Sequence, residues 1–326
     1  MKRIVILGST GSLGKQTLEL IKKHKKEFKV LALSSHKNKE LLDSQAKEFK
    51  VRHTVLSSKD GSEKLKKLCQ LSEADIVINV LSGVAGIEPT ITTLKEGKTL
   101  LLGNKESLIA SGKKVDIKNI IPIDSEHNAI HEILKKYPEK KIKKIILPCS
   151  GGPFFGRSRK ELENISVEEA LNHPRWKMGA KISLESATLI NKGLEIIEAH
   201  YLFKIPLNKI EVIIHPEAII HGIVQFEDCE IAYLSKPDMK EHIENALLES
   251  INLERPNGEI RELKKDEFTF HTANHNLFKG IDLVKKAFIL GDMRGFLEKE
   301  EEILKEFTEG KIKFLEIFSR IEATLC

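Results

Sequence analysis

Cysteine is scarce in this chain of 326 residues, and long apolar runs are missing from it. Its four cysteines are scattered and form no C-x-x-C pair; they are Cys69, Cys149, Cys229 and Cys326. This scatter argues against a disulfide framework or a structural zinc site and favours a reducing, cytoplasmic location. No apolar run approaches the roughly 20 residues of a transmembrane helix. The first apolar run ends after four residues at Gly8, so we expect a buried strand there and no signal peptide.

A strong excess of either charge is also missing. The chain has 53 basic and 48 acidic residues, a net charge of +5, and 40% hydrophobic residues. Basic and aromatic residues are not interleaved as in proteins that bind single-stranded nucleic acid. The densest basic run, Lys135–Lys144, is typical of a solvated face. We therefore expect a globular protein of about two domains, with no nucleic-acid and no membrane partner.

Short apolar runs alternate with polar helical stretches over residues 1–123, which predicts an α/β fold with a Rossmann-like parallel sheet. The expected strands of this sheet are Ile4–Leu7, Val30–Ser34, His53–Leu56, Ile76–Val80, Thr99–Leu102 and Ile120–Ile123. The following segment, residues 124–260, predicts a central α+β domain with more nearly antiparallel strands and a helix over about Thr188–Tyr201. Its expected strands are Ile145–Leu147, Glu211–Ile214, Ile219–Phe226 and Glu230–Leu234. Residues 261–326 predict a linker and a small C-terminal helical region, with helical spacing over Phe296–Phe307 and Phe314–Ala323.

A glycine-rich turn, G-S-T-G-S-L-G, lies between the first predicted strand and the first predicted helix. Its glycines allow the backbone to approach a pyrophosphate, which the amides of the following helix can bind. Many such turns are glycine-rich for packing reasons alone, but the flanking strand and helix favour a dinucleotide site. The residues expected to contact the cofactor here are Gly8, Ser9, Thr10, Gly11, Ser12 and Leu13.

The residues after the second predicted strand indicate which dinucleotide binds. An acidic residue at this position would bind the ribose hydroxyls of NAD. The chain instead has Ser35, His36, Lys37 and Asn38, and a lysine among small polar donors suits the 2′-phosphate of NADPH. The other interpretation is an exposed loop that is basic for no functional reason.

Two further polar segments follow predicted strands, at the edge where open α/β sheets bind ligands. Asn104, Lys105 and Glu106 follow one strand, and a helix start with Asn104 as N-cap explains them equally well. Asp124 and Glu126 follow another. In extended backbone, residues two apart point the same way, so both carboxylates can face one Mg²⁺ or Mn²⁺ ion. Acidic pairs are also common on surfaces without a metal.

The central segment contains the densest group of polar residues. Ser150 precedes two glycines, which predicts either an anion-binding nest or an ordinary turn. Asn191, Lys192 and Glu195 have the spacing of one helix face, whereas Ser186 has the spacing of another face. Gly193 costs about 1 kcal/mol in a helix, so we expect a close neighbour that requires it. Trp176, in a polar loop, fits either a core position or a lid over a ligand.

Taken in order along the chain, these motifs resemble one known family. They read GSTGSLG, GNKESL, DSEHNAI, SGGPF, HPRWKMGAKISLESATLINKGLEIIEAHYLF and IHPEAIIH. Together they closely resemble the 1-deoxy-D-xylulose 5-phosphate reductoisomerase family, from residue 1 to about residue 250 and more weakly beyond. The resemblance implies an NADP-dependent oxidoreductase that converts this sugar phosphate to 2-C-methyl-D-erythritol 4-phosphate for isoprenoid precursors. It also implies a homodimer.

The resemblance further implies roles for individual residues. Asp124, Glu126 and Glu195 would ligate Mg²⁺ or Mn²⁺. The implied catalytic residues are Lys105, Asp124 and Glu126. The implied substrate contacts are Ser125, Ser150, His173, Trp176, Ser186, Asn191, Lys192 and Glu195. The implied cofactor contacts, besides the glycine-rich turn, are Ser35, Lys37, Asn38, Asn104, Lys105, Glu106, Gly179 and Met239. Trp176 and Met178 would belong to a mobile loop at about residues 172–181.

The chain departs from the family's pattern at several positions. His36 stands where a glycine is frequent, Pro148 and Cys149 replace small residues, and Glu185 replaces an aspartate. A C-terminal motif of small residues with Asn and Glu reads RGFLEKEEEI here, near Arg294–Ile303. Two other functions stay open on these residues. One is a semialdehyde-dehydrogenase-like enzyme with Cys149 as nucleophile, and the other is a nucleotide-binding module without catalysis.

Overall fold

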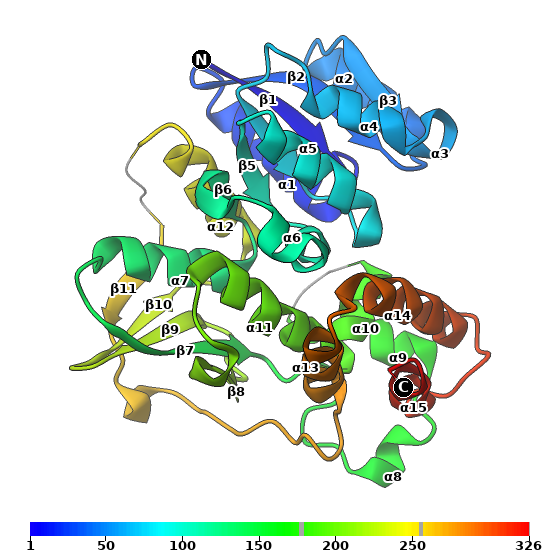
Figure 1. Ribbon diagram of the computed structural model, residues 1–326, viewed down its shortest axis with the longest axis vertical. Helices are drawn as coiled ribbons and strands as arrows, with labels where there is room; N and C mark the ends of the chain where they lie inside the picture. Colours follow the sequence, from blue (N-terminus) through cyan, green and yellow to red (C-terminus); the bar gives the residue numbers. More distant parts are fainter. Residues whose placement is uncertain (176–178, 254–256, 326) are drawn as a thin grey trace. The chain divides into compact units, whose positions relative to one another are not determined.

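The computed structural model describes residues 1–175, 179–253 and 257–325. The chain divides into two compact units (Figure 1). The first comprises residues 1–128 and 238–257, and the second comprises residues 129–237 and 258–326. The expected domains, with boundaries at residues 123 and 260, are each continuous in sequence, whereas both units combine separate segments. As a division by function, the expected domains stay a prediction.

The first unit contains a six-stranded parallel sheet in the order β3-β2-β1-β4-β5-β6. Its strands are β1 (Lys2–Leu7), β2 (Phe28–Ser35), β3 (His53–Leu56), β4 (Ile76–Asn79), β5 (Thr99–Leu102) and β6 (Ile120–Pro122). This order is that of a doubly wound sheet, in which successive strands are added outward in one direction from β1 to β3 and in the opposite direction from β4 to β6. Leu7 at the end of β1 pairs with Ser34 on one side and Asn79 on the other. The predicted α/β fold with a Rossmann-like sheet is confirmed.

Helices connect these strands because the polar stretches between them have apolar residues at helical spacing. They are α1 (Ser12–Lys23), α2 (Lys39–Glu48), α3 (Ser57–Asp60), α4 (Ser62–Cys69), α5 (Ile87–Lys95) and α6 (Lys105–Ser111). Short 3-10 turns are η1 (Gly83–Gly86), η2 (Gly112–Lys114) and η3 (Ile117–Asn119). Helix α7 (Ser125–Lys136) begins in the first unit and continues into the second.

A helix from much later in the chain also belongs to the first unit. In α12 (Met239–Glu249), Ile243, Ala246 and Leu247 are fully buried in the same core as Ile4 and Leu18. The two larger side chains, Ile243 and Leu247, each contribute roughly 2 kcal/mol through burial. Because these apolar positions are three and four apart, one face of α12 fits against α1. This packing is why the chain's division into units does not follow its order in sequence.

The second unit contains a mixed sheet in the order β11-β10-β9-β7-β8. Its strands are β7 (Ile142–Cys149), β8 (Ile210–Ile214), β9 (Ile220–Phe226), β10 (Glu230–Leu234) and β11 (Glu259–Glu262). Strands β7, β9 and β10 pair antiparallel as expected, β11 adds to β10 in the same way, and β7 and β8 pair in parallel. Strand β11 was not expected, since its sequence E-I-R-E has a single apolar residue and forms a polar edge.

Helices complete the second unit (Figure 1). They are α8 (Arg159–Leu162), α9 (Val167–Leu171), α10 (Ala180–Ala187), α11 (Ile190–Phe203), α13 (Gly280–Leu290), α14 (Met293–Thr308) and α15 (Glu316–Ala323), with 3-10 turns η4 (Leu207–Lys209) and η5 (Lys265–Glu267). The predicted helix over Thr188–Tyr201 is confirmed only from Ile190 onward. Leu189 has a left-handed backbone, φ +59°, which ends α10 and separates it from α11. The predicted C-terminal helical region is confirmed by α13–α15.

Candidate active site

Two glycines of the turn after β1, Gly8 and Gly14, are packed too tightly to carry a side chain. Gly8 has φ +91°, and a β-carbon there would lie 2.8 Å from the carbonyl oxygen of Val80. A β-carbon on Gly14 would lie 2.3 Å from the carbonyl oxygen of Gly8, so the first turn of α1 lies directly against the loop. Glycine is therefore required at Gly8 by the backbone conformation and at Gly14 by the packing of α1.

The amino-terminal end of α1 fits an anionic group. Gly11 is the N-cap and has no side chain to bind the first amides of the helix, and residues Ser12–Lys15 include no acid. No acidic side chain in this turn therefore offsets the partial positive charge at the amino-terminal end of the helix. Ser9 is fully buried and its hydroxyl donates to Gln45 at 2.8 Å, so this side chain fixes the turn to α2. The turn as built suits a pyrophosphate bound through backbone amides.

The end of β2 carries no carboxylate. Ser35 is buried, and its hydroxyl lies 2.7 Å from that of Thr10, which ties the end of β2 to the glycine-rich turn. Lys37 is exposed. Asn38 is the N-cap of α2, and its side-chain oxygen accepts from the amide of Leu41 at 3.1 Å. An exposed ammonium two residues after Ser35 suits a 2′-phosphate, which is consistent with NADPH.

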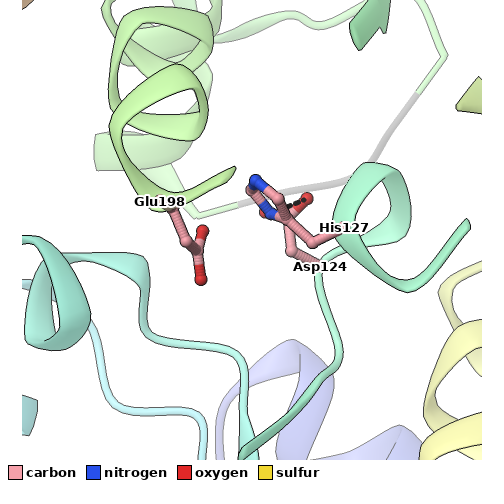
Figure 2. A group of neighbouring side chains, drawn as sticks. All are labelled: Asp124, His127 and Glu198. Carbon is pink, nitrogen blue, oxygen red and sulfur yellow. Dashed lines mark ion pairs between the residues drawn. The ribbon is translucent and has the colours of Figure 1, made fainter. Parts of the chain in front are cut away.

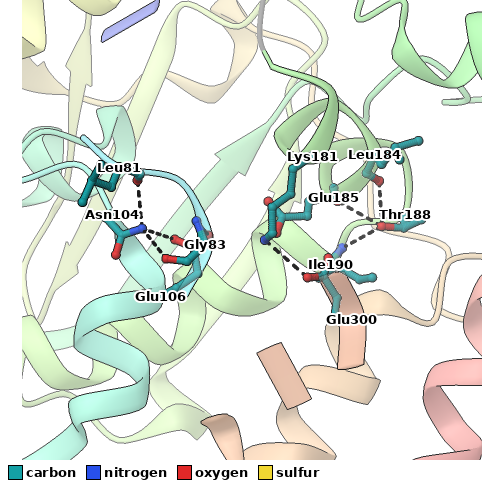
Figure 3. Close-up of polar contacts among 10 residues, drawn as sticks. All are labelled: Leu81, Gly83, Asn104, Glu106, Lys181, Leu184, Glu185, Thr188, Ile190 and Glu300. Carbon is teal, nitrogen blue, oxygen red and sulfur yellow. Dashed lines mark hydrogen bonds and ion pairs between the residues drawn. The ribbon is translucent and has the colours of Figure 1, made fainter. Parts of the chain in front are cut away.

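Asn104 and Glu106 hold the loop that follows β4 (Figure 3). The side-chain amide of Asn104 donates to the carbonyl oxygens of Leu81 at 2.9 Å and Gly83 at 3.0 Å. A carboxylate oxygen of Glu106 accepts from the amide of Gly83 at 3.0 Å. Asn104 also caps α6, because its oxygen accepts from the amide of Ser107 at 3.1 Å. The helix-start interpretation of this segment is therefore right for Asn104, and the predicted cofactor contacts of both residues stay predictions.

Asp124 lies between a lysine and a histidine of its own unit. Its carboxylate is 2.7 Å from the ammonium of Lys105. It is 3.6 Å from Nδ1 of the fully buried His127, as Figure 2 shows. Burial acts to raise the pKa of Asp124, but the charge of Lys105 and the contact with His127 outweigh it. They hold the pKa of Asp124 well below its usual range, so the carboxylate is ionised at neutral pH.

The expected extended backbone at Asp124–Glu126 is wrong. Strand β6 ends at Pro122, and α7 starts at Ser125, so Glu126 lies in the first helical turn. The amide of Asn128 donates to the carbonyl oxygen of Asp124 at 2.8 Å, a helical bond. Ser and Asp before an acidic first turn are helix-start signals. The apolar run of β6 favoured a longer strand, and the prediction followed that run. Without the helix, the i, i+3 pairing of Asp124 with His127 was not predicted.

In the second unit, Ser150 begins a glycine turn at the end of β7. Gly151 and Gly152 have φ +88° and +69°, and the amide of Gly152 donates to Oγ of Ser150 at 3.3 Å. The same hydroxyl lies 3.3 Å from Nε2 of His173. Burial lowers the pKa of His173 to about 4, so the ring is neutral at neutral pH. Ser150 and His173, both predicted as substrate contacts, thus lie together.

The end of α10 lies against this glycine turn. A β-carbon on Gly152 would be 3.0 Å from the carbonyl oxygen of Ser186. Ser186 is half-buried and belongs to α10, not to the helix that carries Asn191. The spacing argument that placed Ser186 on another face of one helix therefore does not apply, because the two residues lie on separate helices.

Helix α11 carries Asn191, Lys192 and Glu195, which were predicted to share one helix face. The amide of Asn191 and the ammonium of Lys192 both contact Glu195, the latter at 2.5 Å. Lys192 also donates to the carbonyl oxygen of Pro148 at 2.8 Å, so α11 is tied to the end of β7. Glu195 is 1% exposed. A buried carboxylate between a lysine and an amide can bind a cation, since its charge is desolvated and its geometry is fixed.

The close neighbour expected at Gly193 is confirmed. A β-carbon there would lie 2.9 Å from Cβ of Val284 and 3.1 Å from Cα of Ile281, both in α13. The glycine lets α11 and α13 approach closely, so α13 packs directly against the helix that carries Glu195. The need for glycine is therefore structural.

The remaining predicted residues are distributed as follows. Trp176 and Met178 lie outside the described residues. Gly179 is the exposed N-cap of α10, and Met239 starts α12 and packs, half-buried, on the core of the first unit. Cys149 ends β7, where its carbonyl oxygen accepts from the amide of His215 at 2.7 Å. Among the described residues, no helix is both long and apolar enough to cross a membrane.

Comparisons with known proteins point to one family. A family model described as 1-deoxy-D-xylulose 5-phosphate reductoisomerase matches residues 4–70 and 55–112. A second model, for the C-terminal domain of that enzyme, matches residues 120–203. Together they span the glycine-rich turn, the Asp124 segment and the residues of α11.

Relatives over the whole chain have the same name. The 1-deoxy-D-xylulose 5-phosphate reductoisomerase of Sulfurihydrogenibium is 42% identical over 100% of this chain and 91% of its own length. That of Clostridium tetani is 39% identical over 99% and 91%.

Solved structures agree with these relatives. A DOX-P reductoisomerase in complex with NADPH, fosmidomycin and magnesium has a TM-score of 0.88 and 32% identity, over 100% of this chain and 89% of that one. The enzyme from Zymomonas mobilis in complex with NADPH has a TM-score of 0.85 and 30% identity, over 99% and 91%. The chain therefore belongs to the 1-deoxy-D-xylulose 5-phosphate reductoisomerase family.

Proposed function

We propose that this chain catalyses the NADPH-dependent rearrangement and reduction of 1-deoxy-D-xylulose 5-phosphate to 2-C-methyl-D-erythritol 4-phosphate. The observation that carries this proposal is the arrangement around Glu195 in a chain of this family. There, a buried carboxylate with a lysine and an amide lies on a helix tied to the glycine turn after β7. A reaction of a sugar phosphate that depends on a metal needs a carboxylate that binds the metal and polar groups that bind the phosphate.

The first unit fits NADPH, which supplies a hydride when bound. Gly8 and Gly14 allow the turn to pack closely against α1, whose amino-terminal amides are the proposed contacts for the pyrophosphate. Lys37 is the proposed contact for the 2′-phosphate. We assign the remaining cofactor contacts from the family. They are Ser9, Thr10, Gly11, Ser12, Leu13, Ser35, Asn38, Asn104, Lys105, Glu106, Gly179 and Met239.

Three carboxylates, Asp124, Glu126 and Glu195, are the proposed ligands of Mg²⁺ or Mn²⁺. All are oxygen donors, which hard dications prefer. Asp124 is held ionised by Lys105, and Glu195 is buried and oriented by Lys192. When bound, the metal polarises a carbonyl oxygen and increases the acidity of a hydroxyl.

The other polar residues of the second unit bind and orient the substrate in this proposal. Ser150, Ser186, Asn191 and Lys192 hold the phosphate, which does not react, and this binding energy orients the reacting end. Neutral His173 keeps a hydrogen bond to Ser150 without adding charge. Lys105 and Ser125 contact substrate oxygens. The loop at about residues 172–181, with Trp176, excludes water. We also infer a cytoplasmic homodimer, as the family resemblance implies.

The test is NADPH oxidation with 1-deoxy-D-xylulose 5-phosphate and Mn²⁺, comparing the wild type with Glu195→Gln. We expect turnover that requires the metal, and a loss of at least about a hundredfold in the variant. Glu211→Gln is the matched control, because Glu211 is an exposed carboxylate on β8 paired with Lys144. Loss of turnover in Cys149→Ala but not in Glu126→Gln would indicate a semialdehyde-dehydrogenase-like enzyme instead. NADPH binding without turnover at saturating substrate and metal would indicate a non-catalytic module.

A further inference from the structure

An acidic residue occupies the centre of the apolar face of α14. The buried residues of this helix are Met293, Phe296, Leu297, Glu300, Ile303, Leu304 and Phe307, at helical spacing. Glu300 is 0% exposed, and both of its carboxylate oxygens are buried. An ionised side chain in such a position is stable only when a cation or hydrogen bonds compensate its desolvation. Its neighbour in sequence, Glu301, is exposed.

The compensating cation comes from α10. The ammonium of Lys181 lies 3.3 Å from Glu300 and also pairs with Glu185, one turn further along its own helix (Figure 3). Glu185 is 2% exposed. Lys181 therefore bridges a buried carboxylate of its own helix and one of α14. This bridge fixes the first turn of α10, directly after residues 176–178.

The other end of α10 is fixed independently. The hydroxyl of Thr188 donates to the carbonyl oxygen of Leu184 at 2.8 Å, and that of Glu185 is at 3.2 Å. A β-carbon on Gly280, at the start of α13, would lie 2.3 Å from the carbonyl oxygen of Thr188. Ser186 lies between these two anchors, against the glycine turn at Gly152.

We propose that Glu300 is a positioning residue that acts through Lys181 to hold α10, and with it Ser186, in place for the substrate's phosphate. Positions of phosphate-binding hydroxyls matter because a small displacement weakens a bond that orients the substrate. The C-terminal helices, where this chain departs most from its family's pattern, thus contribute to the site through a buried ion pair. The proposal rests on the proposed function, since Ser186 is assigned to the phosphate there.

The test compares Glu300→Met, which replaces the buried carboxylate by an apolar side chain, with Glu301→Met, the same change at an exposed neighbour. We expect Glu300→Met to raise KM for the sugar phosphate about tenfold while kcat changes less. Glu300→Gln keeps an acceptor oxygen for Lys181, so its KM should lie between those of the wild type and Glu300→Met. In a Lys181→Met background, Glu300→Met should have little further effect, because both changes break the same contact.

Hydrogen exchange gives a readout that does not need turnover. We expect amides of α10 to exchange faster in Glu300→Met, and added inorganic phosphate to protect α10 in the wild type but not in this variant. Unchanged exchange at α10, or faster exchange confined to α13–α15 with an unchanged KM, would overturn the proposal. If the wild type shows no turnover, the proposed function fails, and the phosphate protection of α10 still decides the role of Glu300.

Discussion

The ammonium of Lys105 lies 2.7 Å from the carboxylate of Asp124, and both residues follow strands of the same parallel sheet. Lys105 follows β5 and Asp124 follows β6, which are adjacent. The carboxyl ends of parallel strands share one edge, so two polar residues 19 positions apart in sequence meet there. The pair combines a proposed metal ligand with a cation that keeps it ionised.

Lys105→Met should reduce kcat/KM for the sugar phosphate by at least about a hundredfold. The variant removes the charge that lowers the pKa of Asp124, so burial then raises that pKa. Because the carboxylate becomes protonated at a higher pH, the acid limb of the pH–rate profile should move upward. Lys118→Met is the control, since Lys118 pairs with Asp116 on the surface. Equal activity of the two variants would show that Lys105 is not catalytic.

Lys37→Ala should change the choice of cofactor. Without the exposed ammonium after β2, we expect kcat/KM for NADPH to fall about tenfold, because a charge-assisted contact with the 2′-phosphate is lost. The value for NADH should change little. Lys39→Ala is the control, because Lys39 pairs with Asp43 on α2. An unchanged ratio of the two kcat/KM values in Lys37→Ala would mean that the 2′-phosphate is bound elsewhere.

Gly14→Ala should destabilise the first unit and weaken NADPH binding. Its β-carbon would lie 2.3 Å from the carbonyl oxygen of Gly8, and moving α1 away from the turn costs about 3 kcal/mol. Gly11→Ala adds the same methyl group 3.4 Å from that oxygen, at φ −72°, so it should be tolerated by the fold. Thermal unfolding and NADPH titration of both variants check this. Equal melting temperatures would contradict the packing argument.

Glu244→Gln should remove an acid-sensitive part of the stability of the first unit. Burial acts to raise the pKa of Glu244, but hydrogen bonds from Lys23, His24 and Asn257 outweigh it and lower that pKa to about 2. Since the pKa is lowered on folding, the stabilisation is complete above the unfolded pKa near 4.5 and disappears as pH falls toward 2. We expect the variant to lose about 2 kcal/mol of unfolding free energy at pH 7.

Urea unfolding at pH 7 and at pH 3 tests this, with the difference between wild type and Glu244→Gln shrinking at the lower pH. Glu19→Gln is the control, because Glu19 and Lys240 join the same two helices through an exposed pair. Exposed pairs contribute little. A loss in Glu244→Gln that is independent of pH would mean that packing, not ionisation, is the cause.

Much of the fold follows from local pattern. Strands β3, β5 and β10 have the predicted bounds. Each is a short apolar run between polar stretches, a pattern that favours strands. The helical face of Asn191, Lys192 and Glu195 was also predictable, since it depends only on a period of 3.6 residues. One prediction failed where a local signal was ambiguous. The segment at Asp124 fitted both a strand extension and a helix start, and packing of α7 decided between them.

The sequence by itself determined the parallel sheet, the glycine-rich turn, the absence of a carboxylate after β2 and the family's motifs. These depend on periodicity and on residue types at fixed spacing, which are local properties of the chain. Only the tertiary structure decided that α12 joins the first unit, that α10 and α11 separate at Leu189, and that Glu300 meets Lys181. These contacts join residues far apart in sequence or depend on a backbone conformation that packing selects, and no local pattern specifies either.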